Sequence, residues 1–371
     1  MLSAKPAAVS ALVIFPALTA ATSYSLVKEY SGSTFFNDWS FYGNYDNLTN
    51  GDAIFVTRDV AASSNLAYVN SAGNAIIKVD NTTTVDYNYK RNTVRVASTD
   101  EYAVGSVWVA DMLHVPYGCS VWPAWWSQAS AWPSGGEIDT FEGVNMVTMN
   151  QVALHTSHGC TITGAVQTST LVNSTDCSYD DNANEGCVVT VTSTNSYGAG
   201  FAAAGGGVYV TEFSEVGINV WFFTRSEVPP ALSTNLSVDT SALGTPTVNY
   251  PPTDCDINTY FAAQHLIFDI TLCGGTLTAL LSHLDFAGSS SVYAETCGTG
   301  TCYTDNVIGN GSNYASAYFE IQYVKVFSNS STSTSSGSGN SNRGDRGAAV
   351  GAGLGALLGL GIAALALALS V

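Results

Sequence analysis

The amino-acid sequence predicts an all-β fold, an antiparallel sandwich of many short strands. Three stretches are rich in the β-branched and aromatic residues typical of strands: 107–112, 218–224 and 266–272. In the last of them large apolar side chains alternate, which places Leu266, Phe268, Ile270 and Leu272 on one face. Turn-forming residues separate such stretches, as at 50–51, 71–74 and 205–207. No helical periodicity is long enough for a helix that connects parallel strands, so an antiparallel sandwich is favoured over a βαβ fold.

The length of 371 residues suits one large β domain with additional segments at both ends. Residues 1–21 have the features of a secretory signal peptide: Lys5, an apolar stretch at 7–18 and small residues at 19–21. A structural first helix is the alternative. Export agrees with eight cysteines, an even number expected to pair in an oxidising compartment, although their connectivity does not follow from spacing. It also agrees with six glycosylation motifs, at Asn47, Asn81, Asn173, Asn235, Asn310 and Asn329.

The composition changes abruptly after Phe327. Residues 328–346 comprise a stretch at 328–342 that is almost entirely serine, threonine, glycine and asparagine, which predicts a flexible linker, and a short polar spacer at 343–346. Residues 347–371 are apolar and follow small residues at 337–342. This layout predicts a glycosylphosphatidylinositol (GPI) anchor signal, whose tail is removed. A retained transmembrane helix is the alternative, because the tail is long enough to span a bilayer.

The formal net charge of −18 limits the partners of this chain. Such a protein repels nucleic acid and anionic lipid headgroups, so no nucleic-acid partner is expected. Solubility alone also accounts for the charge. The sequence has no Cys-x-x-Cys pair, and His155, His158 and Cys160 form only a weak cluster, so we expect neither a metal nor a cofactor.

One acidic cluster stands out in a chain with only 11% charged residues: Ser-Gly-Gly-Glu-Ile-Asp-Thr-Phe-Glu-Gly at 134–143. On a β-strand, Glu137 and Asp139 point to the same face. Glu142 is out of phase by one residue, and a single β-bulge between Asp139 and Glu142 would return it to that face. The two glutamate carboxyl groups would then lie ~5–6 Å apart, the spacing of glycosidases that retain configuration.

Acidic residues on a strand often form only its solvated face, and this is the alternative. Two features favour a functional site instead. The glycines at 135–136 allow a ligand or another backbone to approach closely. Trp132 lies five residues before Glu137, and three more tryptophans at 122–126 would suit a surface on which sugars stack. Trp108 and Trp221, in contrast, lie within strong strands and are expected in the core.

The segment Gly-Glu-Ile-Asp-Thr-Phe-Glu-Gly resembles the bulged Glu-x-Asp-x-x-Glu signature of glycoside hydrolase family 16. Trp-Pro-Ala-Trp-Trp at 122–126, followed by Trp-Pro-Ser-Gly-Gly-Glu-Ile-Asp at 132–139, is similar to the fungal laminarinase branch of endo-1,3(4)-β-glucanases. The resemblance runs from about Tyr24 to Phe327, nearly all of the expected catalytic domain at 22–327. It implies a concanavalin A-like β-jelly roll with a substrate cleft across its concave sheet.

The resemblance also implies roles for individual residues. Glu137 matches the nucleophile, Glu142 matches the acid/base, and Asp139 would hydrogen-bond and orient Glu137. Trp132 matches the tryptophan that lines the subsite where the bond is cut. His155 lies on the strand expected beside the catalytic one, near the acid/base carboxylate and the reacting sugar, with a structural histidine as the alternative.

Three further residues are candidates for substrate binding. Trp122 and Trp126 belong to the segment that the resemblance places at the cleft, although the rings at 122, 125 and 126 cannot all face it. Asn50 lies in Asp-Asn-Leu-Thr-Asn-Gly at 46–51, which is similar to the family's Asp-Pro-Thr-Asn-Gly but differs from it by two replacements and one insertion. Its contact with substrate is therefore the least supported of these expectations.

Together these features predict a monomeric, GPI-anchored endo-β-glucanase that hydrolyses 1,3- or mixed 1,3/1,4-β-glucan at the cell surface, with retention. A neutral polysaccharide suits the negative charge of the chain, and a polyanionic one does not. A wall-remodelling transglycosylase on the same fold is one alternative. A non-catalytic glucan-binding protein is another, but binding alone would not require all three carboxylates.

Overall fold

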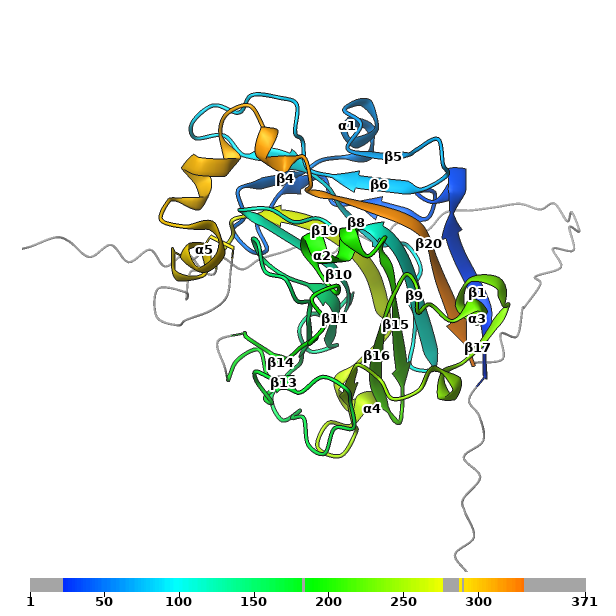
Figure 1. Cartoon of the computed structure of the whole chain (residues 1–371). Helices are drawn as coiled ribbons and strands as arrows, with labels where there is room; N and C mark the ends of the chain where they lie inside the picture. The colour runs from blue at the N-terminus through cyan, green and yellow to red at the C-terminus, as the bar shows by residue number, and fades with distance from the viewer. Residues whose placement is uncertain (1–22, 182–183, 276–286, 289, 330–371) are drawn as a thin grey trace, which may run out of the picture. The chain divides into compact units, whose positions relative to one another are not determined.

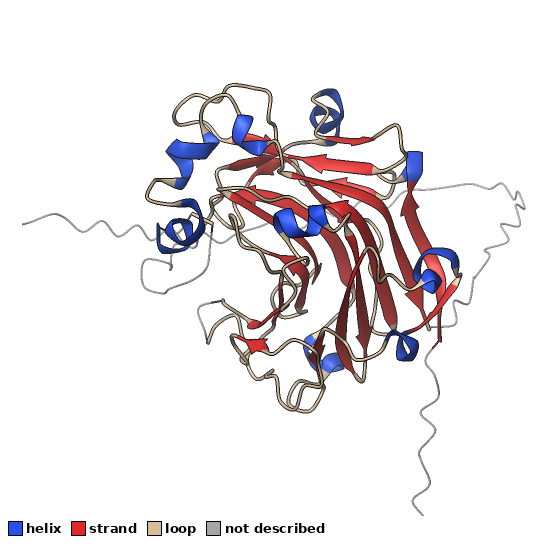
Figure 2. Ribbon diagram, in the orientation of Figure 1, coloured by secondary structure: helices blue, strands red, loops and turns tan. Residues whose placement is uncertain are grey.

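The computed structural model describes residues 23–181, 184–275, 287–288 and 290–329. Two large antiparallel sheets face each other, so the predicted sandwich is confirmed (Figure 2). The expected signal peptide at 1–21 lies outside the described residues, as do the tail and the linker from residue 330 onward. Within the described ranges, no helix has both the length and the apolar character needed to cross a membrane.

The first sheet is called the outer sheet, and its central strands are β20, β9 and β15 (Figure 1). The order of its main path is β17 (Ser237–Asp239), β1 (Ser23–Ser31), β20 (Tyr318–Ser328), β9 (Ser106–His114), β15 (Gly207–Ser214), β16 (Gly217–Thr224) and β18 (Val248–Tyr250). Off this path, β6 (Ala75–Lys78) pairs with β20, and β5 (Ala67–Val69) pairs with β6.

The second sheet carries the acidic cluster and is called the cleft sheet. Its order is β13 (Leu171–Val172), β14 (Cys187–Thr190), β12 (Gln151–His155), β11 (Glu137–Glu142), β10 (Val121–Ala129), β19 (Gln264–Leu272), β8 (Arg95–Ser98) and β2 (Trp39–Phe41). A small third sheet joins β3 (Asn44–Tyr45), β4 (Ala53–Phe55) and β7 (Arg91–Thr93). The α-helices are short: α1 (Arg58–Ser63), α2 (Gly198–Ala203), α3 (Pro230–Thr234), α4 (Ile257–Tyr260) and α5 (Ser290–Cys297).

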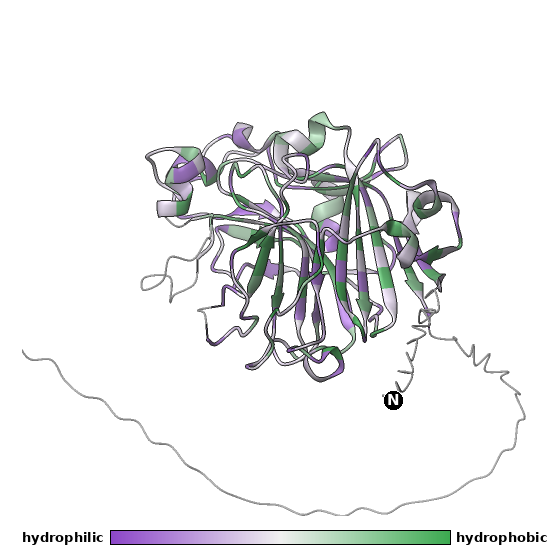
Figure 3. Ribbon diagram, turned by 60° about the horizontal axis from the view of Figure 1, so that its bottom comes forward, coloured by the Kyte–Doolittle hydropathy of each residue, from purple (hydrophilic) through white to green (hydrophobic). Residues whose placement is uncertain are grey.

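Hydrophobic residues occur along the strands of both sheets (Figure 3). On β19, Leu266, Phe268, Ile270 and Leu272 are all fully buried, as predicted. Phe268 stacks on Trp125 at 4.3 Å between ring centroids and meets Phe319 of the outer sheet at 5.1 Å. Trp108 and Trp221 are also buried, as expected. Trp108 belongs to the same core as Phe268, whereas Trp221 belongs to a separate apolar cluster on the outer sheet. The contacts of Phe268 join the two sheets through the apolar layer between them.

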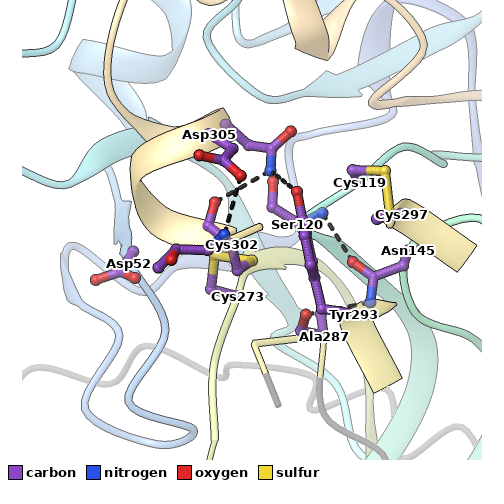
Figure 4. Close-up of a disulfide and its surroundings, with 12 residues drawn as sticks. Asp52, Cys119, Ser120, Asn145, Cys273, Ala287, Tyr293, Cys297, Cys302 and Asp305 are labelled. Atoms are coloured by element: carbon purple, nitrogen blue, oxygen red, sulfur yellow. Dashed lines mark hydrogen bonds between the residues drawn. A yellow bond between two sulfur atoms is a disulfide. The ribbon is translucent and has the colours of Figure 1, made fainter. Parts of the chain in front are cut away.

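All eight cysteines form disulfides, in pairs that the sequence left open: Cys119–Cys297, Cys160–Cys255, Cys177–Cys187 and Cys273–Cys302. Two of these bonds tie the segment around α5 to the ends of the central cleft strands (Figure 4). Cys119 precedes β10, and Cys273 follows β19. Between them, Asn145 accepts a hydrogen bond from the Ser120 N–H at 2.8 Å and donates one to the carbonyl of Ala287 at 3.1 Å. The α5 segment is thereby held over one end of the cleft sheet.

Candidate active site

The predicted β-bulge is present in β11. Asp139 pairs with Ala153 of β12, and the next paired residue is Glu142, opposite Gln151. The two intervening residues both point away from the cleft. The Thr140 hydroxyl bonds that of Thr211 on the outer sheet at 2.6 Å, and Phe141 is fully buried. Because these two consecutive side chains both enter the core, Glu142 returns to the face of Glu137 and Asp139. All three carboxylates line one cleft.

Glu142 is half-buried and receives a hydrogen bond from a tryptophan. The indole Nε1–H of Trp122 donates to its Oε1 at 2.7 Å. Burial raises the pKa of Glu142 and the charge on Glu137 raises it further, while the Trp122 bond and the charge of His155 oppose the shift. Since a raised pKa favours the protonated carboxyl, Glu142 suits the role of a general acid.

Trp122 lines the cleft, as expected from its segment, and its role in substrate binding stays a prediction. The side chain is only 9% exposed and packs in a small cluster with Val144, Ala287 and Val292. The last two residues belong to the segment that the disulfides hold over the cleft sheet. The indole N–H contacts Glu142 at the cleft, and this contact was not foreseen from the sequence.

Glu137 lies beside the exposed tryptophan that the resemblance singled out. The Nε1–H of Trp132 donates a hydrogen bond to Oε2 of Glu137. The Trp132 ring is 43% exposed, lines the cleft and lies 5.8 Å from the ring of Tyr179. An exposed indole beside the reacting carboxylate can stack on a sugar while it orients that carboxylate.

Asp139 and His155 form a buried pair next to Glu137. The His155 Nε2 lies 3.3 Å from Asp139 Oδ2, and its Nδ1 lies 3.2 Å from Asn184 Oδ1. Burial would lower the pKa of His155, but the charges of Glu137, Asp139 and Glu142 together with the Asp139 bond raise it to about 10. Burial, and then the charge of Glu137, raise the pKa of Asp139 well above its usual range. The imidazolium therefore supplies the positive charge among three carboxylates.

This pairing corrects two expectations. Asp139 directs its carboxyl group to His155, and the charge of Glu137 raises the pKa of Asp139, whereas a direct hydrogen bond between Asp139 and Glu137 was expected. His155 is paired with Glu137 in the register of β11 and β12, so it lies beside the nucleophile candidate. It was expected to lie near the acid/base, Glu142. Both differences have the same cause. The register of β11 and β12 places His155 across from Glu137 and Glu142 at the opposite end of the paired strands.

The cleft has a volume of about 370 Å³ and continues from the carboxylates past Trp126. Trp126 lies on the same face of β10 as Trp122, whereas Trp125 is buried, so one of the three rings faces the core as expected. The Trp126 Nε1–H donates to Asp269 at 3.1 Å, and the Arg95 guanidinium lies 4.8 Å from its ring centroid. Burial raises the pKa of Asp269 to about 7, against the opposing charge of Arg95.

Asn50 is exposed and is not among the residues that line the cleft, so its expected contact with substrate stays a prediction. Its backbone takes a left-handed conformation at φ 52°, and its amide donates to the carbonyl of Gly275 at 3.1 Å. Leu48 and Thr49 line the cleft in its place. The turn between β3 and β4 therefore uses Asn50 for its own geometry.

The structure also adds residues that the sequence did not single out. Arg95, Asp269 and Asn184 lie in the cleft wall, and so does Asn173, one of the glycosylation motifs. Arg95 and Asp269 are charged residues in otherwise apolar strands, which was a detectable signal. The weak cluster of His155, His158 and Cys160 does not exist as a metal site, because Cys160 is bonded to Cys255. Glu137, Asp139 and His155 each offer a ligand atom within 4.8 Å of the others, but the proton chemistry above already accounts for these groups.

The chain that carries this bulged strand and cleft is similar to known proteins along most of its length. The family model described as XgeA-like, catalytic GH16 domain, matches residues 39–327. The chain belongs to glycoside hydrolase family 16. A probable glycosidase of Schizosaccharomyces pombe is 39% identical over 83% of this chain and 70% of its own length.

Solved structures of family 16 agree with this membership. Laminarinase 16A from Phanerochaete chrysosporium is 34% identical, with a TM-score of 0.75 over 82% of this chain and 99% of that one. An elongating family 16 β-1,3-glucosyltransferase is 36% identical, with a TM-score of 0.71 over 82% and 100%. The predicted concanavalin A-like β-jelly roll is confirmed. The chain spans only about half the length of the Aspergillus relatives it matches, which are named probable endo-1,3(4)-β-glucanases.

Proposed function

We propose that this protein hydrolyses internal linkages of 1,3- or mixed 1,3/1,4-β-glucan and retains the anomeric configuration. The observation that carries the proposal is the bulge in β11, which turns Glu142 to the same cleft wall as Glu137. Two carboxyl groups on one wall provide a nucleophile and a proton donor for the same bond. The Aspergillus relatives named endo-1,3(4)-β-glucanases and the family 16 laminarinases support this class of substrate.

In the first step, Glu137 attacks the anomeric carbon while Glu142 protonates the leaving oxygen. The Trp122 N–H occupies Oε1 of Glu142, so we assign the transferred proton to Oε2. The bond from Trp132 holds Oε2 of Glu137, and we assign the attack to Oε1. In the second step, water attacks the anomeric carbon while Glu142 takes a proton from it. This attack breaks the bond to Glu137 and releases the sugar with its original configuration.

The negative charge of the site moves from one glutamate to the other in this cycle. Glu137 loses its charge when it becomes esterified to the sugar, and Glu142 becomes charged in the same step because it gives up its proton. Each of these charges raises the pKa of Asp139, so the exchange does not require Asp139 to ionise. The His155 imidazolium lies beside Asp139 and offsets the negative charge in both steps.

The cleft suits an uncharged polysaccharide that binds along its length. Its Arg95 is already engaged with Asp269 at 3.5 Å and with the face of Trp126, and the chain as a whole is strongly negative. Trp126 and the exposed Trp132 offer stacking faces for sugars. Resolving the products of laminarin or lichenan by size tests this proposal. Internal cleavage into short oligosaccharides is expected, and release of glucose alone from chain ends would contradict the endo assignment.

Transglycosylation is the second candidate, because the similar family 16 structure at 36% identity is an elongating glucosyltransferase. In that case a sugar hydroxyl replaces water in the second step. The same size-resolved assay separates the two: products longer than the starting oligosaccharide indicate transfer, and products that are only shorter indicate hydrolysis. Binding of laminarin without turnover would indicate the non-catalytic alternative.

We further propose that the protein is exported, glycosylated, monomeric and held at the cell surface by a GPI anchor. The signal-like residues at 1–21, the glycosylation motifs and the apolar residues at 347–371 support this. Mass spectrometry of the purified membrane form should find no peptide from 347–371, and its presence would indicate a retained membrane segment. Light scattering on the catalytic domain tests the monomeric state.

A further inference from the structure

The bulge in β11 leaves two backbone groups that the ladder with β12 does not satisfy. They are the carbonyl of Thr140 and the N–H of Glu142. The side chain of Asn150, one residue before β12, bonds both: its Oδ1 accepts from the Glu142 N–H at 2.8 Å, and its Nδ2–H donates to the Thr140 carbonyl at 2.9 Å. The amide thus takes the place of a missing peptide group of the ladder.

Asn150 is fully buried, and its backbone makes two further hydrogen bonds. The backbone N–H of Asn150 donates to the Ser196 hydroxyl at 2.9 Å, and its carbonyl accepts from the Val191 N–H at 2.8 Å. With its backbone fixed, the side chain cannot follow the bulge if the bulge moves. A shift of one residue would turn Glu142 from the cleft to the core, because strand side chains alternate.

We propose that Asn150 is a positioning residue for the acid/base: it clamps the bulge and so keeps the Glu142 carboxyl aimed at the leaving oxygen. This proposal rests on the proposed role of Glu142. Asn150 bonds the backbone of Glu142 and not its carboxyl group. Loss of Asn150 should therefore slow the step in which the Glu142 carboxyl donates its proton.

The test compares two substrates by kcat/KM, which reports the formation of the glycosyl-enzyme. One is a laminari-oligosaccharide, whose leaving sugar needs a proton. The other is a 2,4-dinitrophenyl β-laminaribioside, whose leaving group needs none. A general acid contributes about 10²- to 10⁴-fold, so Asn150→Ala should lose at least about 10-fold more on the first substrate than on the second.

Thr211→Val is the matched control. It removes the buried hydroxyl that bonds Thr140 from the outer sheet but leaves both Asn150 bonds in place. We expect it to lower the stability of the protein and to leave the ratio between the two substrates unchanged.

Asn150→Asp supplies a test that does not depend on the alanine variant folding. A protonated aspartic acid can make both bonds, whereas an ionised one has no proton for the Thr140 carbonyl. The titratable groups around it are Glu142 on β11 and Tyr197 beside Ser196, with Glu137, Asp139 and His155 farther along the two strands. Burial beside Glu142 raises the pKa of the new carboxyl above ~4, so the comparison runs from pH ~4 to pH ~9. Relative to wild type, activity on the oligosaccharide should fall at least about 10-fold as this carboxyl ionises, and activity on the dinitrophenyl substrate should stay level.

The outcomes separate the clamp from the proposed function. Equal losses on both substrates for Asn150→Ala, with a selective loss for Glu142→Ala, would overturn the clamp alone. Equal losses for both variants would overturn the acid role of Glu142 and the clamp with it. Higher relative oligosaccharide activity of Asn150→Asp at high pH would mean that the new charge only raises the pKa of Glu142, which would also overturn the clamp.

Discussion

The bond from Trp122 to Glu142 gives a prediction whose size can be worked out. In the first chemical step Glu142 gives up its proton and becomes charged, so the 2.7 Å bond from the indole strengthens as the reaction proceeds. Hydrogen bonds to charged groups contribute ~1.5–3 kcal/mol and those between neutral groups ~0.5–1.5 kcal/mol. The difference of ~1–1.5 kcal/mol corresponds to a roughly 5- to 13-fold loss of kcat/KM in Trp122→Phe. Because Glu142 is only half-buried, the lower value is expected.

The assay is kcat/KM on laminarin across pH. The Trp122 bond is one of the causes that lower the pKa of Glu142, so its removal raises that pKa further. Since the acid must be protonated, the alkaline limb of the profile should move to higher pH in Trp122→Phe. Val292→Ala loosens the same apolar cluster without removing the N–H and serves as the control. A limb that stays in place or moves to lower pH in Trp122→Phe would refute this account of the bond.

Three further predictions concern the other groups of the site. Glu142→Ala should still form a glycosyl-enzyme from a dinitrophenyl glycoside, and added azide should give a β-glycosyl azide; an α-azide would mean that the two glutamates have exchanged roles. Glu137→Ala should give no glycosyl-enzyme in mass spectrometry of the intact protein, and detection of one would assign the nucleophile elsewhere. In urea unfolding, the wild type should be more stable than His155→Gln below pH 6.5, with an advantage that is lost toward pH 10, because the pKa of His155 rises from 6.5 to about 10 on folding; an advantage that grows with pH would contradict the charged imidazole.

The sequence by itself determined the features that depend only on neighbouring residues along the chain, such as the strand face on which a side chain lies. Alternation with period two placed Leu266 and Phe268 in the core, and the same rule showed that Glu142 needs one extra residue to share a face with Glu137. The bulge was therefore predictable, because the positions of three carboxylates on one strand permit few other arrangements. The exposed Trp132 beside Glu137 came from its resemblance to family 16, since nothing in the local pattern distinguishes a platform from a core ring.

Only the tertiary structure decided which groups meet across strands. The register of β11 and β12 set His155 opposite Glu137, and it also placed Asn150 against the bulge. The α5 segment, tied down by disulfides between residues distant in the sequence, buried Trp122 and left its N–H for Glu142. The physical reason is that strand periodicity fixes the face on which a side chain lies, whereas its burial and its bonding partner depend on segments that arrive from elsewhere in the chain.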